Sequence, residues 1–191
     1  MGIPEINKII ANSVLQVFGG KPKVWKYWDD KNNSSIDILS TVDRPCDGVT
    51  SYSTIGLSDY SIGYTVDDKP LRLEIVGASA TYYEYYPNIL ATCAFCIMNS
   101  SFSASPGAIF RGIVEMYYPN NDMKHVLFTS PFLWESLETL DFPDKKVTWL
   151  LAVPISENEY KFAQKNGVDA LEKLFEREQI DIFNMERRTI L

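Results

Sequence analysis

Residues on which many catalytic and metal sites depend are scarce in this chain. Its 191 residues include three cysteines and one histidine. Three cysteines are too few, and odd in number, for a disulfide scaffold. The sequence contains neither a glycine-rich phosphate-binding loop nor a Gly-x-Ser-x-Gly nucleophile motif. These absences disfavour nucleotide-dependent enzymes and serine hydrolases.

Long apolar runs and clusters of basic residues are missing as well. The longest apolar run, residues 89–98, is interrupted by Thr92, and it is about half as long as the roughly 20 residues of a bilayer-spanning helix. The N-terminus lacks the basic and apolar regions of a secretory signal. Acidic residues outnumber basic ones by 25 to 18, which suits a basic partner and disfavours nucleic acid. We therefore expect a cytoplasmic protein that binds neither membranes nor nucleic acid directly.

The remaining composition is that of an ordinary folded domain. Hydrophobic residues make up 46% and charged residues 23%, as in globular proteins that bury one core without disulfide bonds. We therefore expect a single domain over residues 1–191. Apolar spacing and turn signals predict helices at 6–18, 87–98, 156–165 and 168–175, and strands at 24–28, 36–42, 49–57, 71–75, 109–118, 124–129, 147–153 and 180–183. Because hairpins replace strict strand–helix alternation, the predicted fold class is α+β.

Three of these elements carry sharper expectations. Residues 147–153 are apolar on both faces, which predicts a central strand covered on both sides. Ser156 and Glu159 fit a capping box at the start of the helix that follows. Residues 71–75 alternate apolar and charged side chains, which predicts a half-exposed strand with Glu74 on its polar side.

The cysteines and the histidine suggest two kinds of site, and each has a simpler explanation. Cys93 and Cys96 form a C-x-x-C motif inside an apolar helix, which favours core packing over the exposed setting of a redox pair. With Cys46 and His125 they match the count of a Cys3His zinc site, but only one pair is closely spaced. His125 follows a turn, where an exposed polar residue is ordinary. We expect no catalytic residue, no metal and no cofactor.

A run of four tyrosines around one glutamate, residues 82–86, is the most unusual stretch. It lies within residues 73–110, which contain no Lys or Arg. One explanation is that alternate rings cover a sheet face, and the other is a protein interface, where tyrosine is enriched. Strict alternation predicts one face with Tyr82, Glu84 and Tyr86, and an unpaired carboxylate belongs in solvent. We therefore expect these three residues to bind the partner.

The segment from residue 147 onward resembles the C-terminal part of the suppressor-of-fused domain family. The shared features are an apolar strand that ends in Pro154-Ile155-Ser156, then Glu159, Gly167, Leu171 and Phe175, and a terminal strand followed by Arg187. Upstream, residues 52–58, 73–75, 106–107 and 131–132 fit the same family, so the match covers residues 50–191. Asn184 departs from it, because the resemblance implies an aspartate there.

The resemblance implies an α+β domain with a central mixed, mostly antiparallel sheet flanked by helices, and no catalysis. It implies structural roles for Pro154, Ser156, Glu159, Gly167 and Arg187. The small bacterial single-domain members resemble antitoxin or immunity proteins encoded beside LXG-type polymorphic toxins, nucleases among them. The resemblance therefore implies a non-enzymatic immunity protein whose partner is a cognate, basic protein toxin.

Two other functions stay open on the residues alone. One is an enzyme that uses carboxylates or His125 on a small substrate, and the other is a general protein-interaction domain with an unknown partner. The missing nucleophile, metal and phosphate motifs favour binding over catalysis. A neighbouring toxin gene would support binding, and a metabolic operon would support the enzyme.

Overall fold

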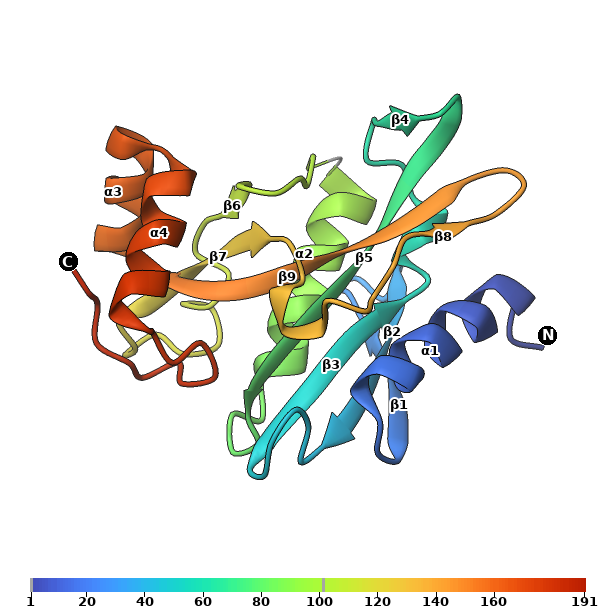
Figure 1. The fold of residues 1–191 in the computed structure, drawn as a ribbon. Helices are drawn as coiled ribbons and strands as arrows, with labels where there is room; N and C mark the ends of the chain where they lie inside the picture. The colour runs from blue at the N-terminus through green and yellow to red at the C-terminus, as the bar shows by residue number, and fades with distance from the viewer. Residues whose placement is uncertain (1, 101) are drawn as a thin grey trace.

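One mixed sheet organises the chain, of which the computed structural model describes residues 2–100 and 102–191 (Figure 1). Its nine strands follow the order β1-β2-β3-β5-β9-β7-β6, with β4 paired to β5 and β8 paired to β9. The strands are β1 (Pro22–Trp28), β2 (Ser35–Val42), β3 (Val49–Ile55), β4 (Thr65–Val66), β5 (Lys69–Ala80), β6 (Ile109–Phe110), β7 (Met123–Thr129), β8 (Leu140–Asp141) and β9 (Lys146–Ser156). Among the described strands, β5 and β9 pair in parallel and every other pair is antiparallel.

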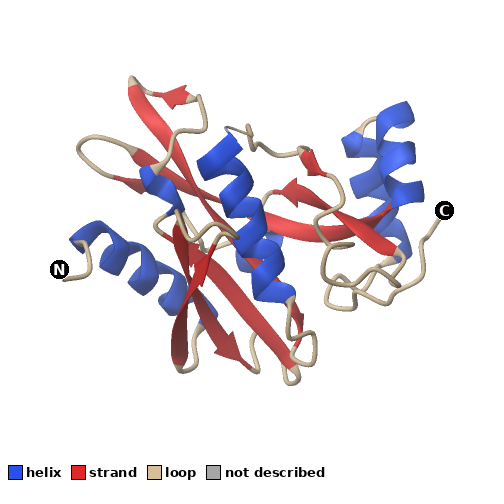
Figure 2. Ribbon diagram, turned by 180° about the vertical axis from the view of Figure 1, so that it is seen from behind, coloured by secondary structure: helices blue, strands red, loops and turns tan. Residues whose placement is uncertain are grey.

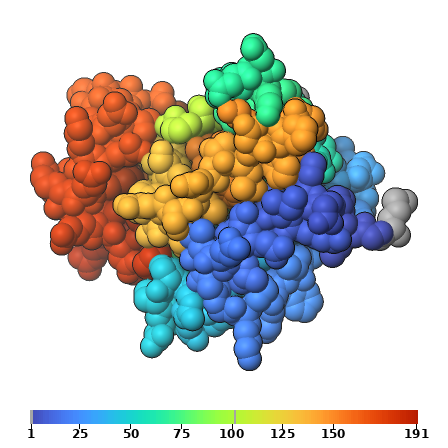
Figure 3. Space-filling model, turned by 45° about the vertical axis from the view of Figure 1, so that its right-hand side comes forward, coloured from blue at the N-terminus to red at the C-terminus, as the bar shows by residue number. Residues whose placement is uncertain are grey.

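Helices cover both faces of this sheet. They are α1 (Glu5–Phe18), α2 (Tyr86–Ser100), α3 (Glu157–Asn166) and α4 (Val168–Glu178), with short 3-10 turns η1 (Leu57–Asp59) and η2 (Phe132–Trp134). Helix α2 packs on one face, and α1, α3 and α4 contribute to the core on the other (Figure 2). On the second face the orange segment around β9 lies between α1 and the red C-terminal helices (Figure 3). The predicted α+β fold, with a mostly antiparallel sheet flanked by helices, is confirmed.

Strands β5 and β9 are buried on both sides, which makes them the centre of the molecule. Leu150 and Ala152 of β9 face α2, whereas Trp149 and Leu151 face the core beneath α1 and the C-terminal helices. Each fully buried aliphatic side chain contributes roughly 1.5–3 kcal/mol. The prediction of a central strand covered on both sides is therefore confirmed for residues 147–153.

Two predicted strands are wrong in whole or in part. Residues 180–183 form a turn, because the Asp181 side chain accepts a hydrogen bond from the Phe183 amide at 3.0 Å. Of the expected strand 109–118, only β6 is extended. Residues 111–117 are turns, which begin where Gly112 adopts a φ of 74° and its amide donates to Nδ1 of His125 at 2.9 Å. Local polar contacts override the apolar pattern at both places.

The prediction that Glu74 faces solvent is also wrong. Its side chain is fully buried, and its two carboxylate oxygens accept hydrogen bonds from Thr54 Oγ1 and from the amides of Gly56, Leu57 and Ser58 at 2.6–3.3 Å. These four donors close the η1 turn onto β5. Burial nevertheless raises the pKa of Glu74 to about 7, although the hydrogen bonds act in the opposite direction.

The three cysteines are free thiols. Cys93 is buried in the α2 core as expected, Cys96 is half-buried, and burial raises the pKa of both. Within the described residues, no cluster of three or more His, Cys, Asp or Glu side chains is arranged to hold a metal ion. In the same part of the chain, no helix is long and apolar enough to span a bilayer.

Candidate functional site

Residues 81–85 form a turn that joins β5 to α2, at the opposite end of β5 from β4 (Figure 1). The amide of Tyr83 donates to the Ala80 carbonyl at 3.0 Å, and the amide of Tyr86 donates to the Tyr83 carbonyl at 3.0 Å. A turn does not alternate its side chains as a strand does. It exposes Tyr82, Glu84 and Tyr85 and buries Tyr83 and Tyr86.

Tyr86 cannot serve as the partner-binding residue that the sequence suggested. Its ring is 1% exposed and fills the space above Gly77, where an added Cβ would lie 2.5 Å from the Tyr86 hydroxyl oxygen. The hydroxyl donates to the Ala152 carbonyl of β9 at 3.1 Å. Tyr86 therefore holds the start of α2 against two central strands, β5 at Gly77 and β9 at Ala152. The neighbouring Tyr85, and not Tyr86, is exposed at the surface.

Tyr83 fastens the same turn to the C-terminal segment. Its hydroxyl donates to Oδ1 of Asn184 at 2.7 Å and accepts from the Glu186 amide at 3.1 Å. The same Asn184 oxygen accepts from the Glu186 amide at 2.9 Å. The side-chain carbonyl of an asparagine accepts these bonds as a carboxylate would. Asn184 therefore makes the same hydrogen bonds that the aspartate implied by the resemblance would make.

The exposed tyrosines belong to a larger aromatic surface. We define the tyrosine patch as Tyr82, Tyr85, Met116, Tyr117 and Tyr118. Tyr82, Tyr85 and Met116 are 66%, 53% and 63% exposed. The ring of Tyr85 stacks on Tyr117 with centroids 6.3 Å apart and meets Tyr118 edge-on at 6.0 Å. The Tyr85 amide also donates to the Tyr118 hydroxyl at 2.9 Å, so the rings are held in place before any partner arrives.

Sequence reasoning missed three members of this patch. Met116, Tyr117 and Tyr118 fell within a segment predicted as a hairpin strand, and the turns at 111–117 instead carry them to the N-terminal end of α2. The available signal was a second tyrosine pair directly before a Pro-Asn-Asn-Asp turn. A tyrosine run and a separate tyrosine pair, each directly before a proline, are a pattern on which an aromatic surface could have been predicted.

Acidic groups surround the patch. Glu84 is exposed between Tyr82 and Tyr85. A hollow of about 230 Å³ next to Met116 and Tyr117 includes Asp29 and Asp30 from the β1–β2 turn, and among the residues that the structure describes no Lys or Arg lines it. Rigid aromatic rings beside carboxylates can desolvate and pair with Lys or Arg side chains of another protein.

Four of the five residues assigned structural roles by the resemblance, Pro154, Ser156, Glu159 and Arg187, come together in one buried network. Ser156 begins α3 with the predicted capping box: its hydroxyl accepts from the Glu159 amide at 3.2 Å, and its own amide donates to Glu159 Oε2 at 2.8 Å. Arg187 donates to both oxygens of Glu159, at 2.6 and 2.9 Å, and to the Pro154 carbonyl at 3.1 Å. Gly167, with a φ of 89°, ends α3 and precedes α4. The network ties β9, α3 and the C-terminal segment together.

His125 is buried rather than exposed, contrary to expectation. Its Nδ1 accepts from the Gly112 amide at 2.9 Å, and its Nε2 lies 2.8 Å from a carboxylate oxygen of Glu157. This hydrogen bond and the nearby Lys161 lower the pKa of Glu157. With both ring nitrogens engaged, His125 links the turn after β6 to α3.

Comparison with known proteins gives one relative of high similarity. The chain is 55% identical over 192 residues to the immunity protein YqcF of Bacillus subtilis strain 168, and the match covers 100% of both chains. The family model described as suppressor of fused protein (SUFU) matches residues 32–188.

Solved structures with low sequence identity share the fold. A SUFU homologue from Neisseria gonorrhoeae matches with a TM-score of 0.75 at 17% identity, over 98% of this chain and 97% of that one. Drosophila Suppressor of Fused matches with a TM-score of 0.58 at 15% identity, over 97% of this chain and 51% of that one. The sequence match and the shared fold agree, and this chain belongs to the suppressor of fused protein (SUFU) family.

Proposed function

We propose that this chain is an immunity protein that binds and neutralises a cognate protein toxin, a basic nuclease of the LXG type, in the bacterial cytoplasm. The observation that carries the proposal is the full-length 55% identity to the Bacillus subtilis immunity protein YqcF. At that similarity both chains share one fold along their whole length. The mode of action is binding without catalysis.

The charge of the chain supports a basic partner. It carries a net charge of -7, and a nuclease surface that holds nucleic acid is rich in Lys and Arg. Opposite charges speed the encounter of two proteins and reject partners of the same sign. An acidic protein that covers the nucleic-acid-binding surface of a nuclease blocks its substrate without performing any chemistry.

The tyrosine patch is the surface that we assign to this contact. Tyr82 and Tyr85 are exposed, and Tyr117 and Tyr118 are half-buried. The rings pack against one another, and the Tyr117 hydroxyl is hydrogen-bonded to Thr92 of α2, so little conformational entropy is lost on binding. Tyr and Arg dominate the binding energy of protein interfaces. Glu84 stands between two exposed rings, where it can pair with a basic side chain that would otherwise bind a phosphate.

Coexpression with the toxin encoded beside this chain tests the proposal. We expect the toxin alone to stop growth and degrade nucleic acid, and coexpression of this chain to restore growth and yield a purified complex without nuclease activity. A catalytically inactive toxin variant should bind equally well, because the contact involves no chemistry. Failure of the wild-type chain to bind and to protect would reject the immunity function. Protection against a toxin without nuclease activity would reject only the nuclease assignment.

A further inference from the structure

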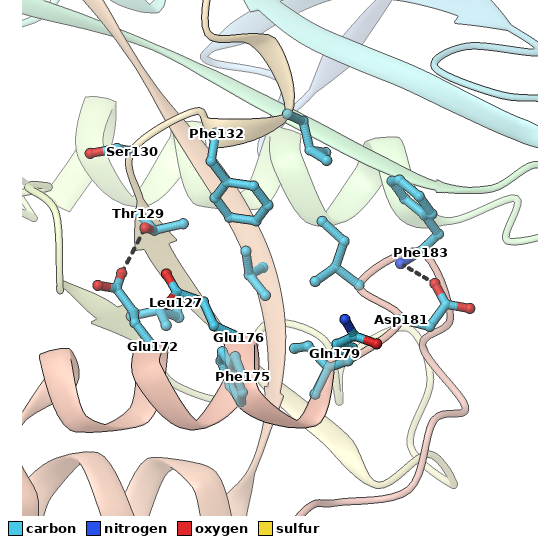
Figure 4. Close-up of a pocket in the computed structure, with 14 residues that line it drawn as sticks. Leu127, Thr129, Ser130, Phe132, Glu172, Phe175, Glu176, Gln179, Asp181 and Phe183 are labelled. Atoms are coloured by element: carbon cyan, nitrogen blue, oxygen red, sulfur yellow. Dashed lines mark hydrogen bonds between the residues drawn. The ribbon is translucent and has the colours of Figure 1, made fainter.

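A groove of about 600 Å³ opens between α4, the end of β7 and the C-terminal segment (Figure 4). Leu127 and Val153 of the sheet line it, together with Ile182 of the C-terminal segment. Phe175 of α4 and Phe132 of η2 face it from two sides, and Phe183 lies at its end (Figure 4). Phe132 is 53% exposed. The groove therefore presents apolar side chains that this chain itself does not cover.

Hydrogen bonds hold the groove open. Gln179 ends α4 in the left-handed conformation, with a φ of 49°. The Phe183 carbonyl then accepts a hydrogen bond from the Ala80 amide at 2.9 Å, which fixes the C-terminal segment to the end of β5. Asp181 caps the same turn through the Phe183 amide. The space between this segment and Phe132 is a preformed feature of the fold.

The ionisable side chains that line the groove are all acidic. They are Glu172 and Glu176 on α4 and Asp181 on the C-terminal segment (Figure 4). Glu172 accepts a hydrogen bond from Thr129 at 2.6 Å. Among the described residues, none of the three carboxylates lies within 4.0 Å of a Lys, Arg or His nitrogen. An apolar groove with an acidic rim is complementary to a segment that combines apolar and basic side chains.

We propose that this groove is a second docking site for the toxin and receives a segment in which an aliphatic or aromatic side chain is followed by Lys or Arg. The apolar side chain enters between Phe132, Phe175 and Phe183. The basic side chain pairs with Glu176 and Asp181. This inference rests on the proposed immunity function and adds the position and chemistry of a contact that the tyrosine patch does not supply.

The acidic charge of the groove favours a basic toxin segment over two other possible occupants. A second copy of this chain carries the same net charge of -7 and would be repelled by the acidic rim. An anionic lipid or fatty acid would bring its negative head group toward the same three carboxylates. A basic segment is attracted by both the rim and the net charge.

Position also favours one partner for both surfaces. Phe183 lines the groove, and the next residue, Asn184, accepts the hydrogen bond of Tyr83 in the tyrosine turn. Tyr82 donates in turn to the Tyr83 hydroxyl at 3.2 Å. Residues 181–186 thus separate the two surfaces by the width of one chain segment. A typical interface of about 800 Å² per partner can span both.

Binding measurements with two groove variants test the inference. Glu176→Lys reverses a rim charge, and Phe132→Ser removes an exposed ring, so neither should lower the melting temperature. Glu178→Lys is the control, because it makes the same charge change on the same helix at a residue that does not line the groove and that pairs with Arg177 instead. We expect Glu176→Lys and Phe132→Ser each to weaken toxin binding by about tenfold or more and Glu178→Lys to change it by less than about threefold.

The possible outcomes separate this inference from the function on which it rests. The loss in Glu176→Lys should arise from slower association and shrink at high salt, whereas Phe132→Ser should speed dissociation. Wild-type affinity in both groove variants, with a toxin that the wild-type chain binds, would overturn the groove and leave the immunity function standing. A wild-type chain that binds no toxin would overturn both. A dimer of this chain that requires Phe132 would assign the groove to a second copy instead.

Discussion

Arg187 binds Glu159 through a two-point ion pair that is buried at the junction of three elements. Two guanidinium nitrogens lie 2.6 and 2.9 Å from the two carboxylate oxygens, and the side chains are 7% and 0% exposed. The same carboxylate accepts the Ser156 amide, and the same guanidinium donates to the Pro154 carbonyl. One pair of charges therefore joins the end of β9, the first turn of α3 and the C-terminal segment that borders the groove.

Removing one partner of this pair should be costly. Arg187→Leu leaves the Glu159 carboxylate buried without its counter-charge, and we expect the free energy of unfolding to fall by about 3–5 kcal/mol. Urea denaturation measures it. Arg188→Leu is the control, because Arg188 is exposed on the same segment. A loss below about 1 kcal/mol in Arg187→Leu would show that the pair contributes as little as a surface ion pair.

The Ser156 cap should contribute to stability and leave binding unchanged. Ser156→Ala removes the hydroxyl that accepts from the Glu159 amide at 3.2 Å and lies 2.9 Å from the Thr189 hydroxyl. We expect a loss of about 1 kcal/mol in the free energy of unfolding, seen as a lower melting temperature. Toxin affinity should match that of the wild type. An unchanged melting temperature with weaker binding would instead place Ser156 at the interface.

Buried Glu74 should make stability depend on pH. Its folded pKa is about 7 against an ordinary value of 4.5, so the folded state retains a proton that the unfolded state has released. The contribution of this carboxyl is full below pH 4.5 and is lost as the pH rises to about 7. Because one pKa unit corresponds to 1.36 kcal/mol, the wild type should lose about 3 kcal/mol over that interval relative to Glu74→Gln.

Urea denaturation of both proteins across this pH range measures the difference. Glu74→Gln is the appropriate reference, because glutamine keeps the size of the side chain and one acceptor for the η1 amides but does not titrate. A constant difference between the two proteins would mean that the four hydrogen-bond donors balance the cost of burial and hold the pKa near its ordinary value.

The sequence predicts well those features that depend on neighbouring residues. The capping box at Ser156, the helix end before Gly167 and the doubly buried β9 all follow from local spacing. The status of Glu74 could not be predicted in this way, because the backbone amides that surround it come from residues 56–58 and meet it only in the folded sheet. Residues 180–183 have strand-like composition, but Asp181 accepts the Phe183 amide locally, and the one backbone bond from Ala80 to Phe183 does not extend into a strand ladder.

In the candidate site, too, some features follow from the local sequence and others depend on contacts that form only in the folded chain. Composition alone identified the tyrosine run, and the exposure of Tyr82 and Glu84 agrees with the expected face. Tyr86 was misplaced because the run is a turn that leads into a helix, where side chains do not alternate. Its burial depends on Gly77, nine residues earlier in the chain, which leaves room for the ring. No periodicity in the tyrosine run itself carries that information.

Substitutions in the tyrosine patch should distinguish its exposed rings from the buried one. Tyr82→Ala and Tyr85→Ala should each weaken toxin binding by about 1–2 kcal/mol, mainly through faster dissociation, because each removes an exposed anchor. Glu84→Lys should slow association and respond strongly to salt. Surface-based binding kinetics at two salt concentrations measure all three variants. Glu84→Lys should retain the wild-type melting temperature, because Glu84 is exposed, whereas Tyr82→Ala and Tyr85→Ala remove ring contacts with neighbouring tyrosines and should lower it only slightly.

Two tyrosine controls complete this test. Tyr86→Phe removes only the hydroxyl that donates to the Ala152 carbonyl, so it should lower the free energy of unfolding by about 1 kcal/mol and leave binding unchanged. Tyr60→Ala removes an exposed ring next to η1, outside the patch, and should alter neither property. If Tyr82→Ala and Tyr85→Ala bind the toxin as tightly as Tyr60→Ala does, the patch is not the interface. Its rings would then serve only to cover the start of α2, and the acidic groove beside α4 would remain to be tested as the contact surface.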